Sequence, residues 1–259
     1  MDESRRKFLK ILGFSTLGLA GTTTMVEAFA PGEAGRYLSY EEAFAGKKWA
    51  MVIDLRKARQ VCKDCRDCID ACHRVHNVPD TDAIEHEVKW IWQDHFEHAF
   101  PTQAHHYLEQ NYRGRPSIVL CNHCDNPPCV RVCPTKATFK RADGIVAMDY
   151  HRCIGCRYCM SACPYGSRSL NWRDPREFLR EIDTEFPTRT KGVVEKCNFC
   201  VERLAQGLMP ACVAACTQGV LSFGDLNDPA SNVSELLSTH HTIRRKPNLG
   251  TEPRIYYIV

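Results

Sequence analysis

The stretch Cys153-Ile154-Gly155-Cys156-Arg157-Tyr158-Cys159-Met160-Ser161-Ala162-Cys163-Pro164 holds four cysteines at the spacing C-x2-C-x2-C-x3-C, directly before a proline. Counted along the chain this is group three. The other groups are group one (Cys62, Cys65, Cys68, Cys72), group two (Cys121, Cys124, Cys129, Cys133) and group four (Cys197, Cys200, Cys212, Cys216). Group one repeats the same spacing, and no cysteine of the 16 lies outside a group. The cysteines therefore decide what this chain can bind.

Three chemistries compete for the cysteines: disulfides, zinc and iron–sulfur clusters. Grouping in fours without a leftover thiol argues against a disulfide framework. Zinc sites usually gather two close pairs, and three cysteines within one short loop fit that pattern poorly. The run C-x2-C-x2-C-x3-C-P is instead typical of bacterial ferredoxins, in which the fourth cysteine ligates the other cluster of a pair. The spacing thus favours iron–sulfur clusters, with a zinc-stabilised adaptor as the alternative.

Composition and the remaining motifs exclude several other functions. A hydrophobic fraction of 44% with 25% charged residues excludes a disordered chain, and a net charge of +3 is too small to imply nucleic-acid binding. Covalent haem needs C-x-x-C-H, and the nearest string, from Cys68 to His73, has one residue too many. The sequence has no dinucleotide fingerprint, phosphate loop or G-x-S-x-G elbow. We therefore expect that the chain has no catalytic site of its own.

The amino terminus reads as an export signal. Ser4-Arg5-Arg6-Lys7-Phe8-Leu9-Lys10 resembles the twin-arginine (Tat) consensus and precedes an uncharged stretch, 11–26. Ala28-Phe29-Ala30 has the form of a cleavage site, but Pro31 would obstruct the peptidase. As a helix, residues 8–26 would be roughly 28 Å long, nearly a full membrane span. We expect segment 1–30 to be a Tat signal that stays as a membrane anchor, with a soluble or peripheral body on the periplasmic face of the cytoplasmic membrane.

An internal repeat predicts the fold. Residues 51–57 before group one and 146–152 before group three each read as a short apolar strand, an Asp turn and a basic residue. The first copy carries four extra residues, 58–61, before its first cysteine. We predict an α+β fold of tandem ferredoxin-like cluster-binding domains with loop insertions. In the body, 31–259, segments 49–72 and 197–259 would hold one cluster pair and 121–166 the second.

Several motifs resemble one family, the four-cluster iron–sulfur subunits that accompany polysulfide, dimethyl sulfoxide and nitrite reductases. These motifs are Cys121-Asn122-His123-Cys124-Asp125-Asn126-Pro127-Pro128-Cys129, the group-three run through Pro164-Tyr165-Gly166, Glu195-Lys196-Cys197-Asn198-Phe199-Cys200, and Phe223-Gly224-Asp225-Leu226-Asn227-Asp228-Pro229. The resemblance covers 49–259 and is weakest over 73–120. Within the family it is closest to subunits of the Dsr type, from transmembrane redox complexes of sulfate reducers.

The resemblance implies four [4Fe–4S] clusters with crossed ligands. Cluster 1 would be held by Cys62, Cys65, Cys68 and Cys216, cluster 2 by Cys197, Cys200, Cys212 and Cys72, cluster 3 by Cys121, Cys124, Cys129 and Cys163, and cluster 4 by Cys153, Cys156, Cys159 and Cys133. Two departures affect clusters 1 and 2: the insertion before Cys62, and His73 and Thr217 where the family often has proline.

The same resemblance implies an electron-transfer role in sulfate respiration. Single electrons would pass between a NrfD-like integral membrane quinone-binding subunit and other redox subunits, including a multihaem cytochrome c. The alternative is the iron–sulfur subunit of a molybdopterin reductase for polysulfide, thiosulfate or nitrite. The aromatic-rich segment 73–120 is an insertion that we expect to serve as core or as a subunit interface.

Cluster charge is a further expectation. Each cluster with four thiolates carries roughly −2 when oxidised, so four of them would turn the net charge of +3 into about −5. We expect basic residues in and beside the loops to offset this charge. The candidates are Lys63, Arg66, Arg131, Lys136, Arg152, Arg157, Lys196 and Arg203.

Overall fold

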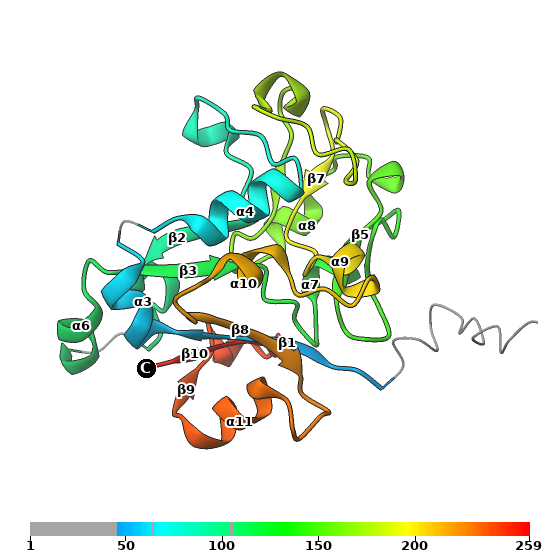
Figure 1. The fold of residues 1–259 in the computed structure, drawn as a ribbon. Helices are drawn as coiled ribbons and strands as arrows, with labels where there is room; N and C mark the ends of the chain where they lie inside the picture. Colours follow the sequence, from blue (N-terminus) through cyan, green and yellow to red (C-terminus); the bar gives the residue numbers. More distant parts are fainter. Residues whose placement is uncertain (1–45, 64, 104–105) are drawn as a thin grey trace, which may run out of the picture. The chain divides into compact units, whose positions relative to one another are not determined.

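The computed structural model describes residues 46–63, 65–103 and 106–259 (Figure 1). The predicted export signal, its cleavage site and the anchor over 1–30 lie outside these residues. Among the helices of the described ranges, none is long and apolar enough to span a membrane.

A four-stranded sheet in the order β8-β1-β10-β9 joins the two ends of the described chain. Its strands are β1 (Trp49–Asp54), β8 (Leu221–Asp225), β9 (Thr242–Ile243) and β10 (Ile255–Ile258). Strand β1 pairs parallel with β10 and antiparallel with β8. This pairing places segments far apart in the sequence, before group one and after group four, side by side in one sheet.

The two faces of β1 follow its alternating side chains, as expected for a strand. Ala50 and Val52 pack with Val233 of helix α11 (Asn232–Thr239). Met51 and Ile53 point the other way, into the main hydrophobic core. The sheet is thus covered on one face by α11 (Figure 1) and on the other by the core next to groups one and four.

The predicted strand–Asp turn–loop repeat is confirmed at both places. In the first copy Asp54 caps helix α3 (Leu55–Val61), because its carboxylate accepts from the N–H of Arg56 at 2.9 Å and of Lys57 at 3.2 Å. In the second copy Asp149 caps the short 3₁₀ helix η3 (Tyr150–Arg152), which follows β5 (Val146–Met148). The four extra residues of the first copy therefore extend a single turn into a short helix.

The cysteine groups lie on short helices and the loops before them. These helices are α4 (Asp67–Val75), α7 (Pro128–Arg131), α8 (Tyr158–Ser161), α9 (Val201–Ala205) and α10 (Ala211–Ala215). Helix α4 packs against α10, and α7 against α8. Two small antiparallel ribbons accompany the second pair, β4 (Thr138–Lys140) with β5, and β6 (Ser169–Leu170) with β7 (Val194–Glu195). The mixture of short helices and small sheets is the predicted α+β class.

Segment 73–120 contributes to the main core. Its elements are η2 (Ile84–His86), β2 (Ile91–His95), α5 (Phe96–Ala99), α6 (His106–Tyr112) and β3 (Pro116–Leu120), and β2 pairs antiparallel with β3. Trp90, Phe96 and Phe100 are fully buried, whereas Tyr107 is 75% exposed. Two further 3₁₀ helices in the described ranges are η4 (Pro175–Phe178) and η5 (Pro247–Leu249).

Candidate metal centres

The third and fourth cysteines of every group are four residues apart, so a helical turn brings both to one side. Cys68 and Cys72 lie on α4, and Cys212 lies on α10, whose C-cap is Cys216. Because α4 and α10 pack together, the third cysteine of each group can meet the fourth cysteine of the other. The same arrangement holds for Cys129 on α7 and Cys159 on α8.

The structure brings the sixteen cysteines together as four mixed sets. Set one (Cys62, Cys65, Cys68, Cys216), set three (Cys121, Cys124, Cys129, Cys163) and set four (Cys133, Cys153, Cys156, Cys159) each line one cavity. Set two (Cys72, Cys197, Cys200, Cys212) is gathered by the packing of α4 on α10 and by the bond from the Ala211 N–H to Cys200 Sγ. Burial raises the pKa of Cys72 well above its ordinary value, and the other three thiols raise it further. Every set contains three cysteines of one group and the fourth of another.

Burial differs between the sets. All four cysteines of set two are buried, and in set three only Cys163 is partly exposed. In set one Cys65 and Cys216 are partly exposed, and set four has three partly exposed members, Cys133, Cys153 and Cys156. Sets one and four therefore reach closest to solvent.

Burial also makes the thiolate form costly without a cation. It raises the pKa of Cys62 to about 11 and of Cys68, Cys124 and Cys197 to about 12, with neighbouring thiols adding to the effect. Iron bound to the sulfurs would supply the missing positive charge. Four converging thiols in a largely apolar cavity, with Val61, Ile118 and Leu221 in the lining of set one, are a donor set that [4Fe–4S] clusters use. The residues thus fit this group.

Backbone N–H groups are directed at the sulfurs of set two. The N–H of Ala211 donates to Cys200 Sγ at 3.3 Å, and that of Phe199 donates to Cys197 Sγ at 3.5 Å. Phe199 and Cys200 both have left-handed backbones, with φ of 58° and 52°. Such φ values are strained for bulky residues. The ring of Phe199 is held by stacking on His123, with 3.7 Å between ring centroids.

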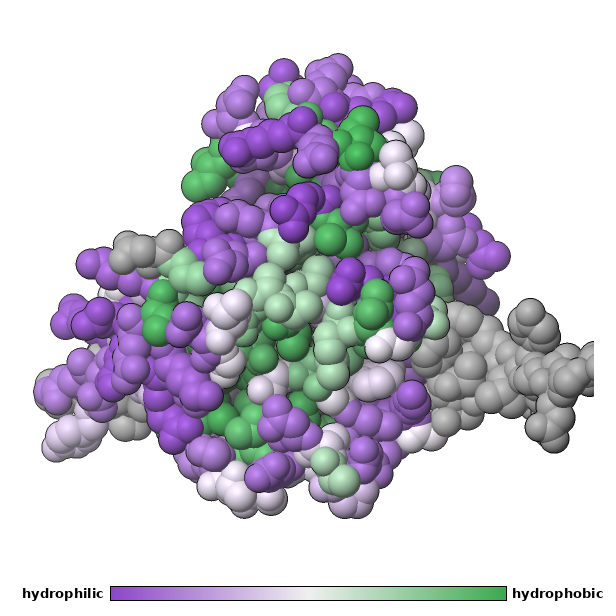
Figure 2. Space-filling view, viewed as in Figure 1, coloured by the Kyte–Doolittle hydropathy of each residue, from purple (hydrophilic) through white to green (hydrophobic). Residues whose placement is uncertain are grey.

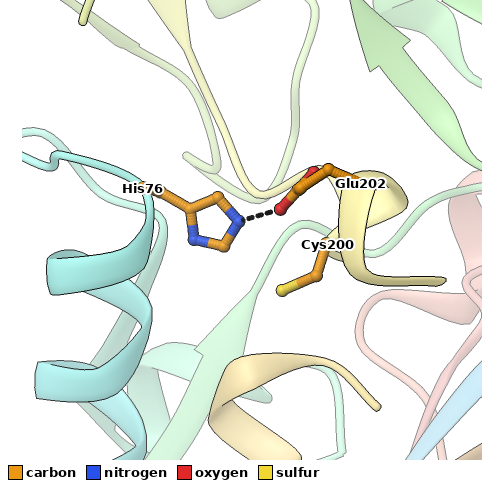
Figure 3. A group of neighbouring side chains, drawn as sticks. All are labelled: His76, Cys200 and Glu202. Atoms are coloured by element: carbon orange, nitrogen blue, oxygen red, sulfur yellow. Dashed lines mark hydrogen bonds and ion pairs between the residues drawn. The ribbon is translucent and has the colours of Figure 1, made fainter. Parts of the chain in front are cut away.

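A buried histidine, His76, lies beside set two (Figure 3). Its ring contacts two acceptors: Nδ1 lies 2.9 Å from the Cys72 carbonyl oxygen, and Nε2 lies 2.7 Å from Glu202 Oε1. The ligand atoms of His76, Cys200 and Glu202 lie within 4.8 Å of one another. Since Cys200 belongs to set two, His76 and Glu202 are surroundings of that set rather than a separate metal site. Each residue lies within four positions of a set-two cysteine, but their contact with each other joins distant parts of the chain and leaves no local sequence signal.

The basic residues behave differently from the expectation. Of the eight candidates only Lys196 is buried, at 1% exposure, and its ammonium donates to the carbonyl oxygens of Val146 and of Cys197. Most of the others are exposed, among them Arg131 and Lys136. A residue outside the expected set, Arg168, is 4% exposed and donates from Nη2 to Cys129 Sγ at 3.1 Å. Arg168 lies just before β6, and nothing in its local sequence marks it as facing the cysteines.

Comparison with known proteins agrees with this geometry. The domain family described as "4Fe-4S dicluster domain" matches residues 117–177 and 182–226, and a second family of the same description matches 61–137. The Hdr-like menaquinol oxidoreductase iron-sulfur subunit 1 of Archaeoglobus fulgidus is 38% identical over 98% of this chain and 97% of its own length. A tetrathionate reductase subunit of Salmonella typhimurium is 37% identical, covering 100% of this chain and 89% of its own.

A third relative is the menaquinone reductase, iron-sulfur cluster-binding subunit of Nitratidesulfovibrio vulgaris, 36% identical over 82% of this chain and 88% of its own. The matches run through both halves of the fold and all four cysteine groups. Sixteen cysteines in 4Fe-4S dicluster domains agree with four [4Fe–4S] clusters. The chain therefore belongs to the family of iron–sulfur electron-transfer subunits that these menaquinol oxidoreductase and tetrathionate reductase subunits represent.

Proposed function

We propose that this chain passes single electrons through four [4Fe–4S] clusters, held by sets one to four, between a quinone-handling membrane subunit and other redox subunits of a respiratory complex of the Dsr type. Each cluster, when bound, accepts and releases one electron. The protein's part is to hold the four sites in sequence, to exclude water from the inner ones and to leave the outer ones accessible.

The observation that carries the proposal is the order in which the four cysteine sets adjoin one another. Sets one and two adjoin because α4 packs on α10, and Cys68 of set one raises further the pKa of Cys212 of set two, which burial has already raised. Sets two and three adjoin where Phe199 stacks on His123, and Cys121 of set three likewise raises the pKa of Cys197 of set two. Sets three and four meet through Arg168 and through the packing of α7 on α8. In the order one, two, three, four, the more exposed sets lie at the two ends. Electrons could therefore enter the path at one end and leave it at the other.

The proposed partners are a NrfD-like integral membrane subunit that handles menaquinone and a multihaem cytochrome c. Support comes from the menaquinol oxidoreductase relative, which is similar over 98% of this chain. An apolar surface also fits a permanent subunit contact. Figure 2 shows hydrophobic residues gathered over the middle of the visible face, in the region of α9 and α10. In the connection between these helices Leu208 and Met209 are 45% and 53% exposed.

A second candidate is the iron–sulfur subunit of a molybdopterin reductase, which the similarity to the tetrathionate reductase subunit over the whole chain supports. Purification of the native complex distinguishes the two. The Dsr type predicts a co-purifying membrane subunit and cytochromes, with a menaquinol analogue bleaching the cluster absorbance near 400 nm. A co-purifying molybdenum subunit, with no such reduction by menaquinol, would select the second candidate.

We propose further that the complex faces the periplasm, with the chain exported by the Tat route and held by an uncleaved helix within 1–30. The support is the sequence Ser4-Arg5-Arg6-Lys7-Phe8-Leu9-Lys10. Replacing Arg5 and Arg6 by lysine should keep the protein in the cytoplasm. An amino terminus near Pro31 in the exported protein would refute the anchor but not the export.

A further inference from the structure

We propose that Arg168 is a tuning residue shared by the clusters of sets three and four, and that its buried positive charge raises the reduction potentials of both. This inference rests on the proposed function, because it takes sets three and four to hold one-electron clusters. It adds a specific residue that makes the clusters of sets three and four easier to reduce.

The guanidinium of Arg168 is held in one place by three different side chains. Nη2 donates to Cys129 Sγ at 3.1 Å, while Nη1 donates to Thr138 Oγ1 at 3.0 Å and to Met148 Sδ at 3.2 Å. The adjacent Ser167 hydroxyl donates to the Leu120 carbonyl oxygen at 3.2 Å, which anchors the backbone next to it. A planar fork fixed at this many points cannot turn away to solvent.

No carboxylate neutralises this charge. Within the described residues Arg168 makes no ion pair with an aspartate or glutamate, whereas the equally buried Arg189 pairs with Glu195. An unpaired buried charge is costly, and its partner must come from elsewhere in the site. The groups that fill this role are the cysteine thiolates of two sets.

Arg168 faces both sets. Besides Cys129 of set three, the guanidinium bonds Thr138 and Met148, which both line the cavity of set four. The nearby charge of Arg168 also lowers the pKa of the Cys159 thiol of set four against the effect of burial. Burial works to lower the pKa of Arg168, but thiolates of both sets outweigh it and keep the pKa above the ordinary arginine value. One cation therefore serves two adjacent sites.

The consequence for electron transfer follows from charge. Reduction adds one negative charge to a cluster, and a fixed cation in a low-dielectric interior stabilises the reduced form more than the oxidised form. Hydrogen bonds to ligand sulfur act in the same direction. At set two the sulfurs of Cys197 and Cys200 accept from backbone N–H groups, and the buried Lys196 ammonium bonds the Cys197 carbonyl oxygen rather than a sulfur. Arg168 therefore favours electrons on the side of sets three and four.

The test is a redox titration, followed by EPR, of the full-length holoprotein and three variants. Arg168→Gln removes the charge while keeping hydrogen-bonding capacity, and Arg168→Lys keeps the charge. Arg131→Gln is the matched control, because it removes the same charge from an exposed residue between Cys129 and Cys133. Iron content is measured for each variant.

Two of the four potentials should fall in Arg168→Gln, each by at least a tenfold change in the reduction equilibrium, which is about 59 mV for a one-electron couple. Arg168→Lys should stay within threefold of the wild type, and Arg131→Gln within twofold. Unchanged potentials in Arg168→Gln at full iron content would overturn the inference, and so would an equal fall in Arg168→Lys. If Arg168→Gln loses iron, normal iron content and potentials in Arg168→Lys support the role of the positive charge. Iron loss in both variants refutes a tuning role. Failure of the proposed function is separate, because it would appear as wrong partners or missing clusters in the wild type.

Discussion

At the residue scale, a network of buried charged residues links β7 to the end of α4. Glu195 is fully buried and accepts from Trp90 Nε1 at 2.9 Å and from Asn171 Nδ2 at 2.5 Å. Its charge is balanced by Arg189, 2.5 Å away and equally buried. The guanidinium of Arg189 also donates to the carbonyl oxygens of His76 and Asn77, so the network reaches the end of α4.

Replacement of Arg189 tests this network. Arg189→Met leaves Glu195 buried without a counter-charge, and we expect the free energy of unfolding to fall by about 3–5 kcal/mol. Denaturant unfolding of the anaerobic holoprotein, followed by circular dichroism, measures it. The control is Arg176→Met, which breaks an ion pair with Asp174 at the surface and should be nearly neutral. Equal stabilities of the two variants would contradict the account.

Asp125 links the sheet to the group-two loop. Its carboxylate accepts from Lys140 Nζ at 3.0 Å and Arg254 Nε at 3.0 Å, and it pairs with Lys48 Nζ at 3.2 Å. Burial acts to raise the pKa of Asp125, but these cations lower it well below its usual range. Because the folded state holds the depressed pKa, the stabilisation is complete above the ordinary aspartate pKa of about 3.9 and is lost as the pH falls through the folded value.

Asp125→Asn should therefore lower the free energy of unfolding by about 1.5–3 kcal/mol at pH 7, the range for hydrogen bonds to charged groups. The difference from the wild type should be constant from about pH 8 to pH 5 and shrink below about pH 4. Denaturant unfolding at several pH values measures this. Asp82→Asn, at an exposed position, is the control and should show little difference at any pH. A difference that grows toward acid pH would be inconsistent with the lowered pKa.

Residue roles are the least predictable part of the site. The cysteines are visible in the sequence because their chemistry depends on spacing. Lys196 is expected because it precedes Cys197, but Arg168 reaches Cys129 only through tertiary packing. His76 lies one turn after Cys72, and its contact with Glu202 depends on tertiary packing. Conversely, Arg131 and Arg157 lie inside cysteine groups and yet are exposed, because the loops bury their sulfurs and leave their polar side chains in solvent.

At the element scale, paired short helices decide which cysteines share a site. Helix α4 carries Cys68 toward set one and Cys72 toward set two, and α10 does the converse with Cys216 and Cys212. The strand, the Asp cap and the position of the extra residues before Cys62 are all readable from the sequence, since they are local. That the extra residues form α3 depends on the cap at Asp54 and on burial of Leu55 and Ala58.

Serine variants test the crossed ligands. Because sets mix two groups, Cys72→Ser and Cys212→Ser should eliminate or convert the same EPR signal, and Cys68→Ser and Cys216→Ser should affect a different one. Low-temperature EPR of the dithionite-reduced proteins, compared with the wild type, measures this. If Cys68→Ser and Cys72→Ser instead affect the same signal, each group binds its own cluster and the crossed assignment is wrong.

At the scale of the whole molecule, the four cysteine sets lie in one compact unit. The sequence repeat predicts two strand–turn–loop units, and the family resemblance predicts the crossed pairs. The contact between set two and set three could not be predicted, because it depends on the stacking of His123 on Phe199 and on the buried Lys196. The sequence is also compatible with segment 73–120 as part of the core or as a subunit interface. Burial of Trp90 and Phe96 places much of the segment in the core.

The apolar surface between α9 and α10 gives a prediction about assembly. Leu208→Asp should reduce the amount of partner subunits that co-purify from membranes by about tenfold, because it places a charge in the proposed contact, while iron content stays normal. Leu249→Asp is the matched control, since Leu249 of η5 is 49% exposed and lies on a different element. Equal recovery of the complex with both variants would remove this surface from the proposed interface.

The most direct test of the central claim is a reductive titration of the anaerobically purified full-length protein, with iron and labile sulfide measured on the same sample. Four sets of four cysteines predict about sixteen irons and sixteen sulfides per chain, an absorbance near 400 nm that bleaches with dithionite, and an uptake of about four electrons. A colourless protein that contains zinc, or one that accepts two electrons or fewer at full metal content, would contradict a path of four clusters.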